Sequence, residues 1–412
     1  MKKYNFSHKG WLMIFISFFL YLLTAACTSD GENVILPKLA AANGWDYTQV
    51  LSLATAAGCL SVIGNLFLGK ICEKKGPKFS IILGLLTSAC FVFLYGSASN
   101  LMVYAIGLFG AICCAQSISF FGASALIANW FPKKKGLAMG IVTIGPPIAT
   151  ITMVSVMNSL LGALGLKKGV LVISAVLVIV AIICFIFVHD TPEECGETPD
   201  NMSQKELTAF HSKEEHTEKL PLGQLLKKKA FWYILIMMGI CNLTQTGLMA
   251  QFLVRYQGTG ISENTVVIMM SIMAFIGIFG SMIVGFFENK LGTQKAYSIF
   301  AALFALAFLL NFTDVPVLVY LSIPLFGIVL TLMQIFLSAF ELSVFGRKNF
   351  KQANAVLFPM ISMIGQLSFL LISACLKLFG EVRYAYLIFA ILLFVTLILN
   401  KLLSTEIVKN ET

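Results

Sequence analysis

Two acidic residues, Asp30 and Glu32, lie in or just beyond the first long apolar stretch of the chain. Ionisable side chains inside a membrane span are costly to bury and mark functional positions. A carboxyl group there can take up a proton and couple proton movement to that of a solute, or it can pair with a cationic group of the solute. The alternative is a wet helix end, where acidic residues are ordinary. The pattern does not separate Asp30 from Glu32.

Two basic residues, Lys38 and Arg255, are expected near the outer mouth of the same cavity. The guanidinium of Arg255 can hold a carboxylate through two hydrogen bonds. Its side chain can instead anchor a helix end at the lipid headgroups. A pair of Arg255 with Asp30 or Glu32 is a hypothesis for an outer gate.

The remaining candidates are polar side chains in other apolar stretches. Glu341 precedes a short basic stretch near the opposite face, so a gating pair with Arg347 or Lys348 is expected there. Hydrogen bonds between helices explain uncharged polar residues as well as contact with a solute does. The candidates for solute contact are the amides Gln116, Asn242 and Gln245.

The cysteines and histidines do not support metal or redox chemistry. The ten cysteines are scattered without the paired spacing of metal ligands, and a buried cysteine usually behaves as a small apolar residue. All four histidines fall outside the apolar stretches, and no phosphate-binding glycine-rich loop is present. We therefore expect no metal, no cofactor and no enzymatic activity.

Membrane-spanning helices must position these candidates. Apolar residues make up 58% of the 412-residue chain and charged residues 12%, whereas soluble domains carry about 25% charged residues. A span needs about 20 apolar residues, and a helix satisfies its own backbone hydrogen bonds in lipid. Twelve spans are expected, at 11–36, 48–69, 80–97, 101–128, 136–162, 169–188, 230–255, 264–287, 296–312, 316–340, 354–378 and 383–403.

The spans form two groups of six, separated by one long polar stretch. We expect an N-terminal six-helix bundle over 1–188, a cytoplasmic linker over 189–229, and a C-terminal six-helix bundle with a short tail over 230–412. The mixed charges of the linker suit a mobile or partly helical tether. The sequence therefore predicts an all-α membrane protein with twelve transmembrane helices.

The net charge of +9 is expected to set orientation rather than to bind nucleic acid. On this topology most of the 29 Lys and Arg residues fall on one side, which the positive-inside rule makes cytoplasmic. Both termini are then cytoplasmic in a multi-pass protein of the cytoplasmic membrane. The expected partners are the lipid bilayer, a small-molecule solute and protons; no nucleic acid is expected, and the protein is expected to be monomeric.

A short loop after the second span recurs in degraded form after the eighth. Both copies follow a long apolar run and lead into another. The copies share two glycines and a lysine at one spacing, namely Gly69, Lys74 and Gly76 in the first and Gly285, Lys290 and Gly292 in the second. A repeat of this kind indicates a duplicated membrane domain, the architecture of many transporters.

With these features the chain resembles the major facilitator superfamily over nearly its whole length. The superfamily's loop motif runs here from Gly69 through Glu73, Lys74 and Gly76 to Lys78. The resemblance implies two six-helix bundles that rock about a central cavity. It also implies a conformational role for the loop, whose charges would complement helix ends in one state. The lysines are explained equally well if they only set the orientation of the chain in the membrane.

Within the superfamily the chain is similar to the oxalate/formate antiporter family. The supporting segments are Asn129–Lys133, Pro37 near the end of the first span, and Phe231-Trp232 at the start of the second half. This similarity implies transport of a small organic acid of the monocarboxylate type, by proton symport or solute exchange. The two basic residues with which the family binds its substrate correspond to positions near Ser281 and Ser362, which are uncharged. The two negative charges of a dianion would therefore lack positive partners in the cavity.

Two other classes of function stay open. The missing basic pair and the acids of the first span favour a transporter of a cationic, zwitterionic or largely apolar solute, for uptake or drug-type efflux. A membrane sensor on the same fold is the third hypothesis, against which the absence of a sizeable polar domain counts.

Overall fold

The predicted all-α membrane fold is confirmed. The computed structural model describes residues 6–203, 206, 220–257, 261, 263–313 and 315–411. Within these ranges the chain holds no strand, and 11 helical stretches are long and apolar enough to cross a membrane. Many large apolar side chains on their outer faces are exposed, such as Phe67 and Leu370, as lipid contact requires.

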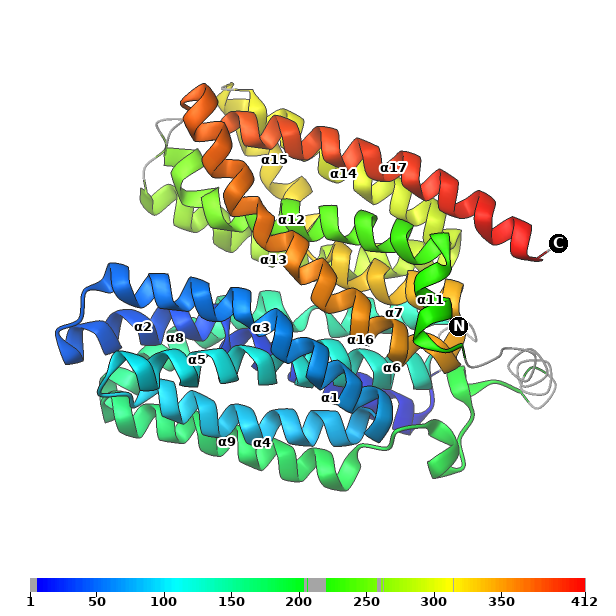
Figure 1. Cartoon of the computed structure of the whole chain (residues 1–412), viewed down its shortest axis with the longest axis horizontal. Coiled ribbons are helices and arrows are strands. Elements are labelled where there is room, and N and C mark those ends of the chain that lie inside the picture. Colours follow the sequence, from blue (N-terminus) through cyan, green and yellow to red (C-terminus); the bar gives the residue numbers. More distant parts are fainter. Residues whose placement is uncertain are drawn as a thin grey trace. The chain divides into compact units, whose positions relative to one another are not determined.

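Figure 1 traces the elements in chain order from blue to red. Up to the predicted linker they are α1 (His8–Cys27), α2 (Ser29–Asn43), α3 (Tyr47–Lys75), α4 (Pro77–Gly96), α5 (Leu101–Gln116), the π-helix η2 (Ser117–Ala123), α6 (Ser124–Trp130), α7 (Lys135–Val142), α8 (Gly145–Leu164) and α9 (Leu166–Phe187). The short 3₁₀ helices η3 (Pro192–Cys195) and η4 (Pro199–Asn201) follow. The remaining elements are α11 (Leu222–Lys227), α12 (Lys229–Gln257), α13 (Glu263–Leu291), α14 (Thr293–Phe312), α15 (Pro316–Val329), α16 (Leu332–Phe379) and α17 (Arg383–Glu411).

The contacts divide the chain into two compact units. Unit 1 comprises Met1–Lys133, Gly145–Glu218 and Arg347–Pro359, and unit 2 comprises Lys134–Ile144, Lys219–Gly346 and Met360–Thr412. Within unit 1, α4 packs along α9, and within unit 2, α14 packs along α17 (Figure 1). Each unit therefore includes a helical segment from the other half of the sequence. The bundle boundaries at 188 and 230 stay a prediction.

The first predicted span, 11–36, is interrupted at Thr28, between α1 and α2. Thr28 has φ −104° and ψ −109°, outside the helical region. Gly31 lies against the carbonyl oxygen of Ala26, where a Cβ atom would collide, so the break depends on glycine. The two acids of this stretch consequently lie in the first turns of a new helix rather than near the end of a long one.

The fourth span contains the π-helix η2, whose wide turn leaves carbonyl oxygens for other groups to bind. Asn354 Nδ2 donates to the carbonyl of Phe120 at 2.7 Å, and Cys72 Sγ donates to the carbonyl of Phe121 at 3.2 Å. Side chains from α16 and α3 thus hold η2 in place. Single π turns within α-helices are frequent at functional sites.

The predicted spans 316–340 and 354–378 have different boundaries in the structure. α15 ends at Val329, inside the first range, and α16 runs from Leu332 to Phe379, helical except at Gly346, where φ is 72° and ψ is 171°. Glycine adopts this backbone conformation without steric cost. The tenth and eleventh spans are therefore joined by a bend at one residue instead of by a loop.

The beginning of the predicted linker 189–229 contains two short 3₁₀ helices, in keeping with the partly helical alternative. Pro192 and Pro199 open η3 and η4, as proline favours at a first helical position. The Asp200 carboxylate accepts the backbone N–H of Lys133 at 2.6 Å. Local turns and bonds to unit 1 therefore order this segment despite its charge.

Candidate functional site

Glu32 lies half-buried in α2, close enough to Tyr95 of α4 for their charges to interact. The Tyr95 side chain is fully buried, and its hydroxyl has no hydrogen-bond partner among the described residues. A phenol can donate to a carboxylate or accept from a carboxylic acid. The sequence pattern did not distinguish Tyr95, whose hydroxyl is the buried polar group within electrostatic range of Glu32. The side chain of Asp30 lies outside the described groups.

Gln116 ends α5 directly before η2, and its side chain is half-buried. Its Oε1 atom is enclosed without a hydrogen-bond partner among the described residues, as is Oε1 of Gln334 near the start of α16 in unit 2. A buried amide oxygen without a donor costs about 1–3 kcal/mol. Each amide stands next to a helix irregularity, and each can accept a hydrogen bond from a solute.

The two amides predicted on α12 contact helix backbones. Gln245 Nε2 donates to the carbonyl of Leu330 at 2.8 Å, in the break between α15 and α16. Asn242 Nδ2 donates to the carbonyl of Ile361 at 3.3 Å and lies against Gly365, where a Cβ atom would collide. These bonds fasten α12 to its neighbours within unit 2. Solute contact by either residue stays a prediction.

Arg255 is buried at the end of α12 and binds the end of α14. Its Nε donates to Oδ1 of Asn311 at 3.1 Å, and its guanidinium donates to the carbonyls of Asn311 and Thr313. Asn311 Nδ2 in turn donates to the hydroxyl of Tyr256 at 2.7 Å. The last carbonyls of a helix have no partner within it, so Arg255 caps α14 in this structure. Its predicted contact with a carboxylate stays untested.

Ser281 is fully buried in unit 2, at a place where two helix breaks meet α13. Its Oγ lies 2.9 Å from Oγ1 of Thr331, in the break before α16, and 3.4 Å from the carbonyl of Thr143, in the break after α7. The other family-aligned serine, Ser362, is half-buried on α16. The structure does not bring these two serines together by any described contact.

The glycines of the loop motif meet other backbone segments within unit 1. A Cβ atom on Gly69 would lie 2.8 Å from Cα of Ala355, so α3 and α16 touch backbone to backbone there. Gly76, with φ 91°, begins α4 and lies against the carboxylate of Asp190. The spacing of these two glycines is therefore required by packing and not by topology alone.

The charged residues of the motif are more exposed. Lys74 is exposed and Glu73 is half-buried. Lys78 places its Nζ 5.4 Å from the ring centroid of Phe185, as a cation–π pair. Their predicted conformational role stays a prediction.

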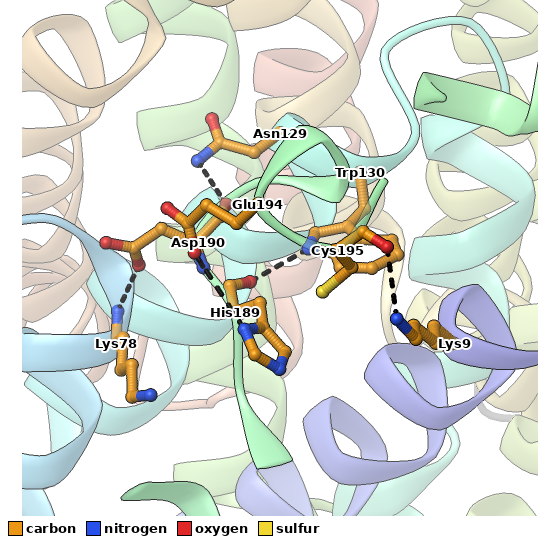
Figure 2. A network of polar contacts seen from close by, with 8 residues as sticks. All are labelled: Lys9, Lys78, Asn129, Trp130, His189, Asp190, Glu194 and Cys195. Carbon is orange, nitrogen blue, oxygen red and sulfur yellow. Dashed lines mark hydrogen bonds and ion pairs between the residues drawn. The ribbon is translucent and has the colours of Figure 1, made fainter. Parts of the chain in front are cut away.

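Figure 2 shows how the start of the linker binds helix ends of unit 1. The Asp190 carboxylate accepts the backbone N–H of Lys78 at 2.6 Å, in the first turn of α4, where the helix dipole favours an anion. Asn129 Nδ2 donates to the carbonyl of Asp190 at 2.9 Å, and Trp130 Nε1 donates to the carbonyl of His189 at 2.9 Å. We call residues 189–201 the linker anchor.

Two side chains extend the linker anchor. Lys9 Nζ donates to the carbonyl of Cys195 at 3.1 Å (Figure 2). Arg347, just after the bend in α16, donates to both carboxylate oxygens of Glu193 at 3.1 and 3.3 Å. Partial burial alone would raise the pKa of Glu193, but the hydrogen bonds and charge of Arg347 lower it below its ordinary value. The gating pair of Glu341 with Arg347 or Lys348 stays a prediction.

Glu341 of α16 is one of three buried charged residues of unit 2, with Lys135 of α7 and Glu288 of α13. All three side chains are buried in unit 2, and Glu341 is 0% exposed. The charge of Lys135 acts on both carboxylates. The sequence pattern missed this set because Lys135 belongs to a run of three lysines typical of a cytoplasmic loop, and Glu288 to a loop motif.

These geometries define a class of protein: a multi-pass helical membrane protein with polar side chains held at breaks in its helices. The family model described as the Major Facilitator Superfamily matches residues 13–369, and the chain belongs to this family. The relatives it matches are named as transporters, not as enzymes.

A solved structure shares the fold of this chain, and two proteins of known sequence are its distant relatives. The solved structure of FucP in its outward conformation has a TM-score of 0.74 and 15% identity, covering 95% of this chain and 98% of that one. MFS-type transporter pytF of Aspergillus terreus (strain NIH 2624 / FGSC A1156) is 25% identical over 201 residues, 45% of this chain and 63% of pytF. Sialic acid transporter NanX of Escherichia coli (strain K12) is 31% identical over 115 residues, 27% of this chain and 28% of NanX. The matches thus span less than two thirds of either relative's length.

Proposed function

We propose that this protein carries a small organic acid of the monocarboxylate type across the cytoplasmic membrane by alternating access, through proton symport or solute exchange. It works as a monomer with both termini in the cytoplasm. The observation that carries the proposal is Glu32, a half-buried carboxyl group in the first turn of α2, directly after the break between α1 and α2. A carboxyl group in such a site exchanges a proton as its surroundings change between water and protein. Asp30, two residues before it, is the alternative proton site.

The acid is recognised by amides and hydroxyls rather than by a guanidinium. In unit 1, Gln116 offers an enclosed oxygen that has no donor among the described residues, which suits the O–H of a carboxylic acid or of a hydroxy substituent. Arg255 is occupied at the end of α14. A monocarboxylate that travels with a proton requires less compensation of charge than a dianion does. The similarity to oxalate/formate antiporters and to a stretch of NanX supports an organic acid.

A second candidate function is transport of a cationic, zwitterionic or largely apolar solute. The hydrogen bond of Arg255 to Asn311 favours this candidate. Arg255 is the basic residue best suited to bind an anionic solute, and here its guanidinium is used to hold the end of α14. In this case Glu32 or Asp30 pairs with the positive group of the solute.

The deciding experiment is uptake by proteoliposomes of labelled monocarboxylates, betaines and amines, with and without an inward proton gradient. Glu32→Gln and Asp30→Asn are tested beside the wild type. Glu381→Gln, an exposed acid paired with Arg383, is the matched control for loss of a carboxylate.

We expect gradient-driven uptake of a monocarboxylate that is lost in Glu32→Gln and kept in Glu381→Gln. Exchange without a gradient should survive in Glu32→Gln if the residue carries only the proton. Uptake of a betaine or amine in place of acids would overturn the organic-acid proposal in favour of the second candidate. Gradient-driven uptake unchanged in both acid variants would remove the proton role from these residues.

A further inference from the structure

The π-helix η2 lies between α6 and Gln116, the amide to which the proposed function gives a role in binding solute. Ser124 donates its backbone N–H to the carbonyl of Ser119, five residues back, whereas an α-helix uses a spacing of four. A turn of this kind holds one residue more than an α turn. It therefore rotates the side chains before it by about 100°, relative to those after it. The direction in which Gln116 points from the fourth span consequently depends on whether the π turn is kept.

The return from the π turn to α6 leaves one carbonyl oxygen without a backbone donor. Counting on from the bond between Ser124 and Ser119, a return to four-residue spacing in α6 passes over the carbonyl of Phe120. Asn354 Nδ2 donates to that carbonyl at 2.7 Å, and Asn354 is buried. Buried carbonyl groups require a hydrogen-bond partner, so the amide of Asn354 stabilises the irregular turn.

Asn354 belongs to a short segment of α16, residues 347–359, that has an irregular residue at each end. Gly346, directly before it, has φ 72°, and Pro359, its last residue, lies inside the helix. Proline lacks the N–H that continues the bonding of a helix. The same two positions mark where α16 enters and leaves unit 1. The segment is therefore joined to the rest of α16 at two points where the helix is weakest.

The segment contacts η2 through one face. The ring of Phe358 stacks on that of Phe120 with centroids 4.1 Å apart, and it meets the ring of Phe121 edge to face at 5.5 Å. Asn354 and Phe358 are four residues apart, which places both on one side of a helix. Of these contacts, the hydrogen bond of Asn354 is the one made to the backbone of the π turn.

Other side chains bind η2 from helices without such weak points. Ser80 Oγ on α4 donates to the carbonyl of Ser117 at 3.2 Å, and Cys72 Sγ on α3 donates to the carbonyl of Phe121 at 3.2 Å. Neither bond involves the carbonyl that Asn354 holds. Movement of the segment 347–359 would therefore remove the donor of one carbonyl and leave these two bonds in place.

From these contacts we infer that Asn354 is a positioning residue for the solute site: its amide keeps the π turn of η2, and the π turn directs Gln116 toward the solute. When the segment 347–359 withdraws, the turn closes to α spacing and Gln116 points elsewhere. Docking of the segment in unit 1 and binding of solute by Gln116 then favour each other to the same extent. The inference rests on the proposed role of Gln116 and does not use Glu32.

The first test reads the carbonyl of Phe120 without any solute. Solid-state NMR in lipid bilayers, with phenylalanine labelled by ¹³C at the carbonyl and ¹⁵N at the amide, gives one carbonyl–nitrogen correlation for each Phe-Phe pair. The sequence has three such pairs, 18–19, 120–121 and 286–287. Phe19→Leu and Phe286→Leu, at exposed positions, identify the other two signals by removing them.

Asn354→Leu should shift the carbonyl signal of the pair 120–121, because the hydrogen bond is lost and the turn changes its spacing. Asn129→Leu is the matched control. It removes an equally buried amide, which donates to the carbonyl of Asp190 in the linker anchor, and it should leave the signal in place. Where Asn354→Leu does not fold, the smaller change Asn354→Ala replaces it in both tests.

The second test asks whether Asn354 acts through Gln116. Uptake by proteoliposomes is measured with labelled lactate, and with glycine betaine and choline as alternative probes. Asn354→Leu should raise KM by about twofold to tenfold, the effect of one lost hydrogen bond, and Asn129→Leu should not. In the double variant with Gln116→Ala, KM should equal that of Gln116→Ala alone, because the amide to be positioned is absent.

The outcomes separate this inference from the proposed function. Uptake of betaine or choline in place of lactate would overturn the organic acid, and the comparison of variants is then made with that probe. Three results would each exclude Asn354 as a positioning residue: independent effects of the two substitutions on KM, a wild-type KM in Gln116→Ala, or an unchanged signal of the pair 120–121 in Asn354→Leu. Absence of uptake with all three probes would overturn the proposed function and the role of Gln116 together.

Discussion

The junction of α3 with Arg347–Pro359 in unit 1 and the junction of α13 with α7 in unit 2 share one backbone plan. In the α3–α16 junction, Gly69 touches the backbone of Ala355, and in the α7–α13 junction, Gly285 touches that of Gly140. Gly69 and Gly285 occupy equivalent positions in the sequence repeat. Duplication has therefore preserved a close helix contact that only small residues permit.

The side chains around the two contacts differ in charge. The repeat aligns Cys72 of the α3–α16 junction with Glu288 of the α7–α13 junction, and Lys351 with Lys135. Cys72 is buried and bonds a carbonyl of η2, while Lys351 is half-buried. Lys135 is buried with two acids. The difference teaches that the same backbone contact can be surrounded by a neutral thiol in one unit and by buried charged side chains in the other.

Removal of the buried lysine is expected to have the largest effect. Lys135→Met leaves Glu288 buried without its cation, which costs about 3–5 kcal/mol, whereas Lys351→Met at the half-buried equivalent position should cost less than about 1 kcal/mol. Thermal unfolding in detergent measures both. The double variant Lys135→Met/Glu288→Gln should recover most of the loss. Equal losses in the two single variants would show that the junctions do not differ in charge burial.

Filling the glycine contacts should damage both junctions alike. Gly140→Val and Gly69→Val each push a side chain into backbone that cannot move aside, at about 1–3 kcal/mol, and transport should fall about tenfold or more. Gly162→Val is the control, since no atom lies within 4 Å of its Cβ position on α8. Uptake by proteoliposomes gives the readout. Normal transport by one of the two variants would break the equivalence of the junctions.

The pair of Glu193 with Arg347 fastens the α3–α16 junction to the linker anchor, and its strength depends on pH. Because the pKa of Glu193 is lowered in the fold, its contribution is fully present above its ordinary pKa of about 4.3. The contribution is lost as pH falls through the lowered value. Glu193 is 40% exposed, so screening limits the contribution to less than about 1 kcal/mol.

Unfolding of Glu193→Gln and wild type should therefore differ at neutral pH and converge in acid. Glu194→Gln, its exposed neighbour without an arginine partner in the described contacts, serves as the control. A difference that grows as pH falls would contradict this sign.

The smallest expected effect is that of Cys72→Ala. The variant removes one weak S–H donor to the carbonyl of Phe121, which should cost less than about 0.5 kcal/mol. Its pH dependence should equal that of the wild type, because Cys72 does not balance a charge. A loss comparable to that of Lys135→Met would mean that η2 depends on this bond far more than the geometry indicates.

The spans could be predicted from the sequence because long apolar runs need only local information. The breaks could not, since Thr28 and Gly346 lie within apolar stretches whose local pattern does not specify the non-helical backbone angles found there. The electrostatic influence of Lys135 on Glu341 was also out of reach, because the two residues are far apart in the sequence.

The residues of the candidate site could be selected from the sequence, but their hydrogen-bond partners could not be predicted. Polar residues in apolar runs are few, so Glu32 and Gln116 could be selected from the sequence alone. The structure distinguishes Gln116, whose amide oxygen has no donor, from Gln245, which binds the backbone of Leu330. Only three-dimensional contacts separate an amide that fastens helices from one that is left to bind something else.

The linker anchor also has a consequence for how the chain is made in the cell. Its bonds to α1, α4 and α6 involve only residues synthesised by the time the ribosome has reached about residue 201, so this end of unit 1 can close during translation. The segment Arg347–Pro359, which completes unit 1, is made much later. The surface around Gly69 therefore stays uncovered until residues 347–359 have been synthesised. A nascent chain stalled before residue 347 should expose that surface to insertion factors.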